Sequence, residues 1–361
     1  MSTTNRFARL RAGRAGTLPG RLLAVVLLLG LVVEAAHQIS AGVHGPDHPL
    51  IDDWLHSGLI LASSALCAWG ARRRTVGPSR AAWWCFATAL LLFGIGEIAW
   101  SMLYADGGDV PTPNATDVLY LATYPLFMAG LVLMIRARVV DVAWHRWLDG
   151  FVLVLIVATP GVLLVIEPVL QSAPIDQLGR AVTVAYPLGD VLLLGALVGT
   201  LPVMSWRLAG SWPWVAAGLV CLTVADCAYS LTAADVSSHD GPYDFLWSAG
   251  ALAFAVGSTR LPTPARASPE ITGWRAVALP LGAQLIAVAT QVYGWFRPLP
   301  GAERLLTIGV LVIGIAKIVV SRPRPPATTA ASPPPARSAR TSPGAGSRRP
   351  RARGLPGRRH R

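Results

Sequence analysis

Residues 81–103 read AAWWCFATALLLFGIGEIAWSML, an apolar run with a single acidic or basic side chain, Glu97. An α-helix rises about 1.5 Å per residue, so roughly 20 apolar residues cover the roughly 30 Å hydrocarbon core of a bilayer. The run therefore predicts a membrane-spanning helix that carries one carboxylate at membrane depth.

The same pattern recurs along most of the chain. Hydrophobic residues make up 53% of the 361 residues and charged residues only 14%, whereas soluble domains average about 25% charged residues. We predict an all-α fold, a polytopic membrane helical bundle of about ten transmembrane helices. The expected spans are 22–39, 54–71, 81–103, 118–135, 147–170, 181–204, 212–234, 245–261, 274–296 and 304–320.

Three segments are expected from the change in composition along the chain: a basic cytoplasmic segment (1–21), the helical bundle (22–320) and a Pro/Arg-rich tail (321–361). The tail contains one leucine and no other large apolar side chain, so it is predicted to be a disordered cytoplasmic tail. Eleven of the 31 basic residues lie in it. The net charge of +12 therefore predicts no folded groove for nucleic acid.

Between the expected spans, loops rich in arginine alternate with loops poor in arginine. If the N-terminus is cytoplasmic, the outer loops contain only Arg180, Arg297 and Arg304. Because cytoplasmic loops carry an excess of arginine and lysine, we predict a multi-pass cell-membrane protein with both termini cytoplasmic. The alternative for residues 1–36 is a cleaved signal peptide. The inner arginines are Arg6, Arg9, Arg11, Arg14, Arg21, Arg72, Arg73, Arg74, Arg80, Arg136, Arg138, Arg146, Arg207, Arg260, Arg266 and Arg275.

Four carboxylates, Glu34, Glu97, Asp190 and Asp226, lie at membrane depth within the expected spans, each in the outer half. Ionisable groups at membrane depth are costly and indicate function. Tyrosines and prolines occur at the same depth, so we predict a polar cavity that opens outward. The alternative is an interfacial aromatic belt with a few buried hydrogen bonds. The predicted ligand-binding residues are Glu97, Tyr124, Tyr186, Asp190, Asp226 and Tyr229.

On a helix, Asp190 shares a face with Tyr186, and Asp226 shares a face with Tyr229. These acids are expected to be neutral and hydrogen-bonded, or to be balanced by a cationic ligand.

A short internal repeat accompanies these carboxylates. In each copy an acid and an aromatic residue end one span, and a second acid and aromatic residue begin the next. The repeat indicates that spans 3–4 and 7–8 are duplicated helical hairpins. Its members are Glu97-x-x-Trp100-Ser101 with Asp117-x-x-Tyr120, and Asp226-x-x-Tyr229-Ser230 with Asp244-x-x-Trp247.

No phosphate loop, dinucleotide fingerprint, nucleophile elbow or H-E-x-x-H motif is present in the sequence. We therefore predict a protein that is not an enzyme and needs no cofactor. A metal site remains the alternative for the first outer loop, although its spacings match no standard helical pair. That loop and its borders contain His37, His44, His48, His56, Asp47, Asp52 and Asp53.

Several stretches resemble the multi-span membrane input domain that precedes GGDEF/EAL (diguanylate cyclase and phosphodiesterase) or kinase modules in bacterial signalling proteins. The resemblance implies a sensor without its own catalysis. Where such proteins continue into a soluble output domain, this chain runs into its Pro/Arg-rich tail, so no cyclase or phosphodiesterase activity is carried over. The resembling stretches are PNATDVLYLATYPL (113–126), LDG (148–150), AYPLGDVLLL (185–194), ADCAY (225–229) and DFLWSAG (244–250).

The expected partners are the lipid bilayer, an unknown small ligand, and a second copy or a separate cytoplasmic output protein. Nucleic acid is not expected. Two alternatives to a sensor stay open. The intramembrane carboxylates and helix-breaking prolines also fit a small secondary transporter or proton-coupled permease. The tail also fits a truncated or frame-shifted product without function.

Overall fold

A computed structural model describes residues 18–41, 48–104, 110–138, 144–172, 176–204, 208–233, 243–260, 274–296 and 301–320. Within these ranges the chain forms helices and no strand. The predicted disordered tail (321–361) and nearly all of the basic segment (1–21) lie outside the described residues.

Each of the ten expected apolar segments coincides with helix. The helices are α2 (Leu18–Ala41), η2 (Leu50–Leu55), α3 (His56–Arg72), α4 (Pro78–Tyr104), α5 (Asp117–Arg138), α6 (Trp144–Gly161), η3 (Val162–Ile166), α7 (Glu167–Ser172), α8 (Gln177–Val203), α9 (Trp212–Ala233), α10 (Phe245–Thr259), α11 (Trp274–Phe296) and α12 (Gly301–Val320). Here η2 and η3 are π-helical turns that run directly into α3 and α7.

In the part of the chain that the structure describes, six helical stretches are long and apolar enough to cross a membrane, fewer than the ten predicted from the sequence. They are Leu22–Ser40, Pro78–Tyr104, Asp117–Arg138, Gly150–Ser172, Gln177–Pro202 and Trp212–Ala233. A shorter apolar helix covers Phe245–Thr259. The protein is therefore an all-α membrane protein by the length and composition of its helices.

Local sequence explains several helix ends and bends. The Asp176 side chain accepts a hydrogen bond from the Gly179 backbone N–H (2.7 Å), which satisfies one orphan donor at the start of α8. Pro125 lies inside α5, and Pro187 lies inside α8. Proline lacks a backbone N–H, so each of these prolines leaves a carbonyl oxygen one turn earlier in its helix without its usual hydrogen bond. Both carbonyls lie in the half of the helix that is nearer to the polar residues.

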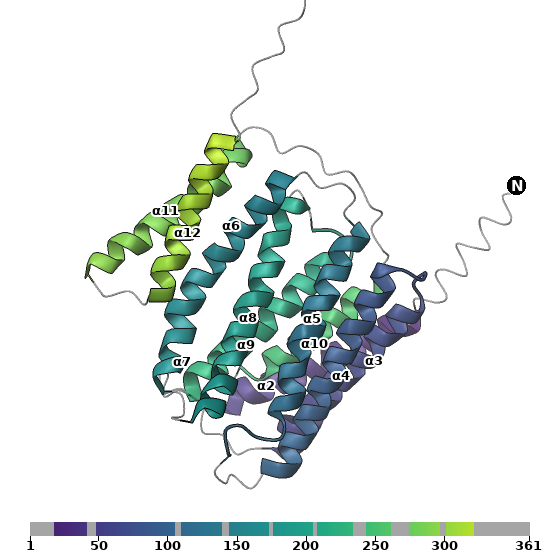
Figure 1. Cartoon of the computed structure of the whole chain (residues 1–361). Helices are drawn as coiled ribbons and strands as arrows, with labels where there is room; N and C mark the ends of the chain where they lie inside the picture. Colours follow the sequence, from purple (N-terminus) through teal and green to yellow (C-terminus); the bar gives the residue numbers. More distant parts are fainter. Residues whose placement is uncertain are drawn as a thin grey trace, which may run out of the picture. The chain divides into compact units, whose positions relative to one another are not determined.

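Sequence neighbours pack as hairpins, with α4 beside both α3 and α5, α9 beside α10, and α6 beside α8. Helix α10 also packs on α2 and α3, so a late helix of the chain lies against two early ones. Figure 1 shows α11 and α12 beside α6, on the other side of the bundle from α3 and α4. The main core is aromatic: the Phe86 ring lies 4.9 Å from that of Phe254 and 5.4 Å from that of Trp83.

Glycines allow α9 and α10 to approach each other closely. A Cβ atom added at Gly218 would lie 3.0 Å from the Gly250 carbonyl oxygen, and one added at Gly250 would lie 3.0 Å from the Gly218 carbonyl oxygen. Small residues at such crossings let helix backbones approach within a membrane, where packing rather than the hydrophobic effect holds helices together.

One arginine joins α3 to α10 at the end of the bundle where both helices finish. Arg74 donates from Nη1 to the carbonyl oxygens of Gly70 and Ser258 (2.8 Å each) and from Nη2 to that of Arg260 (3.1 Å). Its guanidinium also lies 4.8 Å from the centroid of the Trp83 ring. Burial lowers the pKa of Arg74 to about 10, so the side chain stays charged at neutral pH.

Replacing this arginine should loosen the α3–α10 contact. We expect Arg74→Ala to lower the free energy of unfolding by about 2 kcal/mol, because last-turn carbonyls lose charged donors. Unfolding by SDS titration of detergent-solubilised protein measures the change. The exposed Arg72, with its guanidinium 5.7 Å from the Trp84 ring centroid, is the control, and Arg72→Ala should change stability by less than about 0.5 kcal/mol. Equal losses in the two variants would contradict the prediction.

Candidate functional site

A cavity of about 740 Å³ lies where the last turns of α4 and α9 meet the first turns of α5 and α10. Residues of η2, α3 and α8 complete its wall. Its volume falls within the range of pockets that hold small molecules. Six carboxylates line the cavity: Asp52, Asp53, Glu97, Asp117, Asp226 and Asp244. Nine aromatic side chains also line the cavity: Trp54, Phe93, Trp100, Tyr120, Tyr124, Tyr186, Tyr229, Tyr243 and Trp247.

The structure brings the predicted ligand-binding residues together. Five of them line the cavity: Glu97, Tyr124, Tyr186, Asp226 and Tyr229. The sixth, Asp190, is 1% exposed and lies in a small adjoining pocket that also contains Tyr124 and Asp226.

The Tyr124 hydroxyl joins the two deepest carboxyl groups. Its oxygen lies 3.4 Å from Oδ2 of Asp190 and 3.3 Å from Oδ2 of Asp226. A phenol has one proton to donate, so it serves one carboxyl at a time. Trp247 Nε1 also donates to Oδ1 of Asp226 (2.8 Å), and Thr223 hydrogen-bonds Asp190. Within the described helices, no arginine or lysine forms an ion pair with either aspartate.

The hydrogen bonds of these acids run between helices rather than along one helix. Sequence spacing placed each aspartate on the same face as a nearby tyrosine, but Tyr186 donates to Asp117 of α5 rather than to Asp190. Asp226 forms its hydrogen bonds with Tyr124 and Trp247. Tyr229, the tyrosine on the same helix face as Asp226, is 46% exposed. The bundle brings α5, α8, α9 and α10 close enough for these contacts, which the spacing within a single helix does not reveal.

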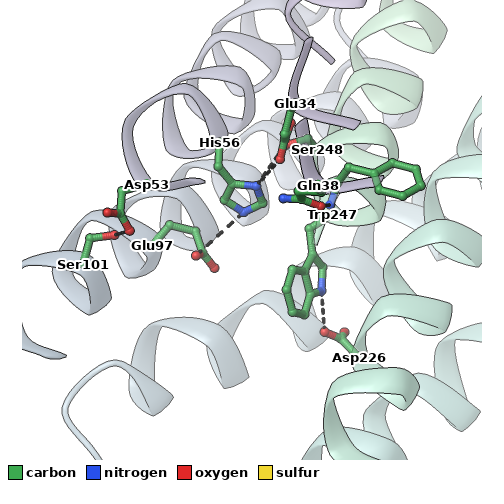
Figure 2. A network of polar contacts seen from close by, with 10 residues as sticks. Glu34, Gln38, Asp53, His56, Glu97, Ser101, Asp226, Trp247 and Ser248 are labelled. Carbon is green, nitrogen blue, oxygen red and sulfur yellow. Dashed lines mark hydrogen bonds and ion pairs between the residues drawn. The ribbon is translucent and has the colours of Figure 1, made fainter. Parts of the chain in front are cut away.

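A buried network missed by the sequence reasoning supports the cavity wall. His56 Nδ1 lies 2.6 Å from Oε1 of Glu34, and the Ser248 hydroxyl donates to the same oxygen (3.1 Å). The other imidazole nitrogen, Nε2, lies 3.8 Å from Oε2 of Glu97. Figure 2 shows His56 between Glu34 and Glu97, and the Trp247 indole reaching toward Asp226. Glu34 and Ser248 are fully buried, so α2, α3 and α10 are joined through polar atoms.

The only sequence signal for this network was Glu34 itself, a carboxylate within an expected span. His56 was grouped with the potential metal ligands of the first outer loop because it borders that loop. In the part of the chain that the structure describes, no three His, Cys, Asp or Glu side chains converge as metal ligands do. His44 and Asp47 lie outside the described residues.

Every position of the short internal repeat lines the cavity. The first copy contributes from α4 and α5 and the second from α9 and α10. Each copy forms one helical hairpin, since α4 packs on α5 and α9 on α10. The two hairpins thus supply most of the carboxylates and rings of one site.

The cavity narrows towards the middle of the bundle. The small adjoining pocket is lined by the polar residues Thr123, Tyr124, Asp190, Thr223 and Asp226 and by five apolar side chains, which include Phe127, Leu193 and Leu219. These three side chains are buried members of the main core. Apolar core side chains therefore lie beside the acidic pair.

Comparison of the chain with known protein families, with curated proteins and with solved structures finds no match. The function is therefore inferred from the geometry of the cavity.

Proposed function

We propose that this protein is a multi-pass cell-membrane sensor that binds a small ligand in the cavity and has no catalysis of its own. The single observation that carries the proposal is the cavity lined by carboxylates and aromatic rings that come from several helices. A ligand there touches several helices at once, so it can favour one packing of them over another. Only such a difference in affinity shifts a conformational equilibrium.

The membrane placement proposed here has about ten spans, both termini in the cytoplasm and the cavity facing outward. The six long apolar helices support it, together with four further apolar helices. One of these, α3, continues from η2, so Leu50–Arg72 is unbroken helix. Arg72, Arg138 and Arg260 lie at the ends of α3, α5 and α10 that are remote from the cavity. Excess arginine on one side favours a cytoplasmic location for that side.

Topology reporters test this placement. Fusions after Arg74, Asp109, Arg138 and Asp240 should report inside, outside, inside and outside, because an odd number of expected spans separates each fusion site from the next. Alkaline phosphatase and green fluorescent protein fusions provide complementary readouts. One reversed site would require a different number of spans.

The resemblance to input domains of bacterial signalling proteins supports a signalling role, and the output is proposed to pass to a second copy or to a separate cytoplasmic protein. In the native host, deletion of residues 18–320 should change the cyclic-di-GMP level or a kinase-dependent output. Asp226→Asn should reproduce the effect of the deletion, since Asp226 lies where cavity and acidic pair meet.

Glu167→Gln is the matched control, because Glu167 is a carboxylate at the start of α7, outside the cavity lining. It should leave the output at the wild-type level. A deletion strain with unchanged cyclic-di-GMP and kinase output would end the sensor proposal.

A proton-coupled transporter is the second candidate, and the buried Asp190–Tyr124–Asp226 contacts favour it. Transporters place such carboxylates near the midplane of the bilayer between helices that rock. Proteoliposomes separate the two functions: solute accumulation driven by a proton gradient and lost in Asp190→Asn would support transport. The apolar core side chains beside the pair favour the sensor.

A further inference from the structure

We propose that the cavity ligand is a small organic cation, a substituted ammonium group attached to an apolar body. This inference rests on the proposed ligand-binding function and specifies the chemistry of the ligand.

Charge is the first reason. The cavity wall contains six carboxylates and one imidazole, and among the lining residues that the structure describes none is a lysine or arginine. Interactions between charges strengthen when water is excluded, so a cation entering this space gains more than it would at an exposed acidic surface. A carboxylate or phosphate ligand would meet repulsion from several directions.

The arrangement of the carboxylates is the second reason. Glu97, Asp117 and Asp226 belong to α4, α5 and α9, and Asp244 directly precedes α10, so the acids come from four different parts of the cavity lining. They do not converge on one point as the ligands of a metal ion do, and no such group occurs among the described residues. A cavity of about 740 Å³ is also far larger than a bare ion needs. The geometry fits an extended molecule whose charged group meets one or two acids.

The aromatic rings are the third reason. The Trp247 ring centroid lies 6.1 Å from that of Tyr229, 6.1 Å from that of Tyr243 and 6.5 Å from that of Phe93. Rings grouped in this way bind substituted ammonium groups through cation–π attraction, which is the use of aromatic cages in proteins that recognise choline. The same rings provide apolar surface for the rest of the molecule.

Trp247 links the rings to the acids. Its Nε1 donates to Asp226 at 2.8 Å, which holds the indole in place. Its ring also lies 6.3 Å from the His56 ring, and His56 Nε2 faces Glu97. An ammonium group near Trp247 would thus lie between Glu97 and Asp226, the two acids shown on either side of this ring in Figure 2.

A matched pair of probes tests the inference on the full-length protein in nanodiscs. Choline is the cationic probe, and 3,3-dimethyl-1-butanol is its neutral isostere. Benzyltrimethylammonium adds a larger apolar body. Binding is measured by the shift in thermal unfolding temperature and by quenching of tryptophan fluorescence. The cations should raise the unfolding temperature with saturation, benzyltrimethylammonium at lower concentration, and the neutral isostere should have no effect below about tenfold higher concentration.

Two variants and one control complete the test. Glu97→Gln and Asp226→Asn should each weaken cation binding at least about tenfold, because each removes one charge and keeps a hydrogen-bonding side chain of similar size. Glu167→Gln should bind as the wild type does. Equal binding of the neutral isostere, no shift with either cation, or unchanged affinity in both variants would overturn the proposal.

The two proposals fail in different ways. If Asp226→Asn abolishes signalling in the host but neither cation binds the purified protein, the sensor stands and the organic cation is wrong. If the cations bind as expected while deletion leaves cyclic-di-GMP and kinase output unchanged, the ligand class stands and the sensor is wrong.

Discussion

His56→Leu should lower the free energy of unfolding by about 3–5 kcal/mol, because it leaves the buried Glu34 carboxylate without its partner. Glu34 is 0% exposed, and its Oε1 lies 2.6 Å from His56 Nδ1. Its second oxygen, Oε2, already has no hydrogen-bond partner within the described part of the chain. Loss of the imidazole would leave a carboxyl group between α2, α3 and α10 with only the Ser248 hydroxyl as donor.

The double variant Glu34→Met/His56→Leu provides the control, since replacing both members of a buried pair by apolar side chains is often neutral or stabilising. It should recover most of the stability lost in His56→Leu. SDS titration of the solubilised protein, followed by circular dichroism, measures all three proteins. A double variant less stable than His56→Leu would show that the pair does not act as a unit.

Gly70→Val should lower the free energy of unfolding by about 3 kcal/mol through overpacking between α3 and α10. A Cβ at Gly70 would lie 2.8 Å from the Cβ, Oγ and carbonyl oxygen of Ser258. Since one of these is a backbone atom, the two helices must separate. Their separation would also strain the Arg74 hydrogen bonds, which join the carbonyls of Gly70 and Ser258.

Gly58→Val, in the same helix, is the matched control. Nothing lies within 4 Å of a Cβ added at Gly58, so this change should alter stability by less than about 0.5 kcal/mol. The same SDS titration distinguishes the two substitutions. A Gly58 variant as unstable as the Gly70 variant would mean that the loss at Gly70 does not come from overpacking against Ser258.

Much of the candidate site could be predicted because depth in a membrane helix follows directly from position in the sequence. Glu97 and Asp226 were expected at similar depth from the ends of their spans, and both line the cavity. Tyr124 and Tyr186 were selected for the same reason. The repeat added Asp117 and Trp247, which also line it.

The sequence did not reveal which polar atoms touch. Tyr124 is 66 residues from Asp190 and 102 from Asp226, and Glu34 is 214 residues from Ser248. Such contacts depend on which helices are neighbours and on how each is rotated. An apolar helix contains little information on either, because lipid and protein interior favour similar side chains.

Hydropathy and helical rise are local properties, so the class of this protein and its approximate helix bounds can be predicted from the amino-acid sequence alone. The packing of the bundle is needed to show that two helical hairpins line one cavity, that Tyr124 joins Asp190 to Asp226, and that His56 joins Glu34 to the cavity wall. The physical reason is close packing. Glycines such as Gly70, Gly218 and Gly250 let particular helices approach, and the helices that approach determine which polar groups lie within hydrogen-bonding distance.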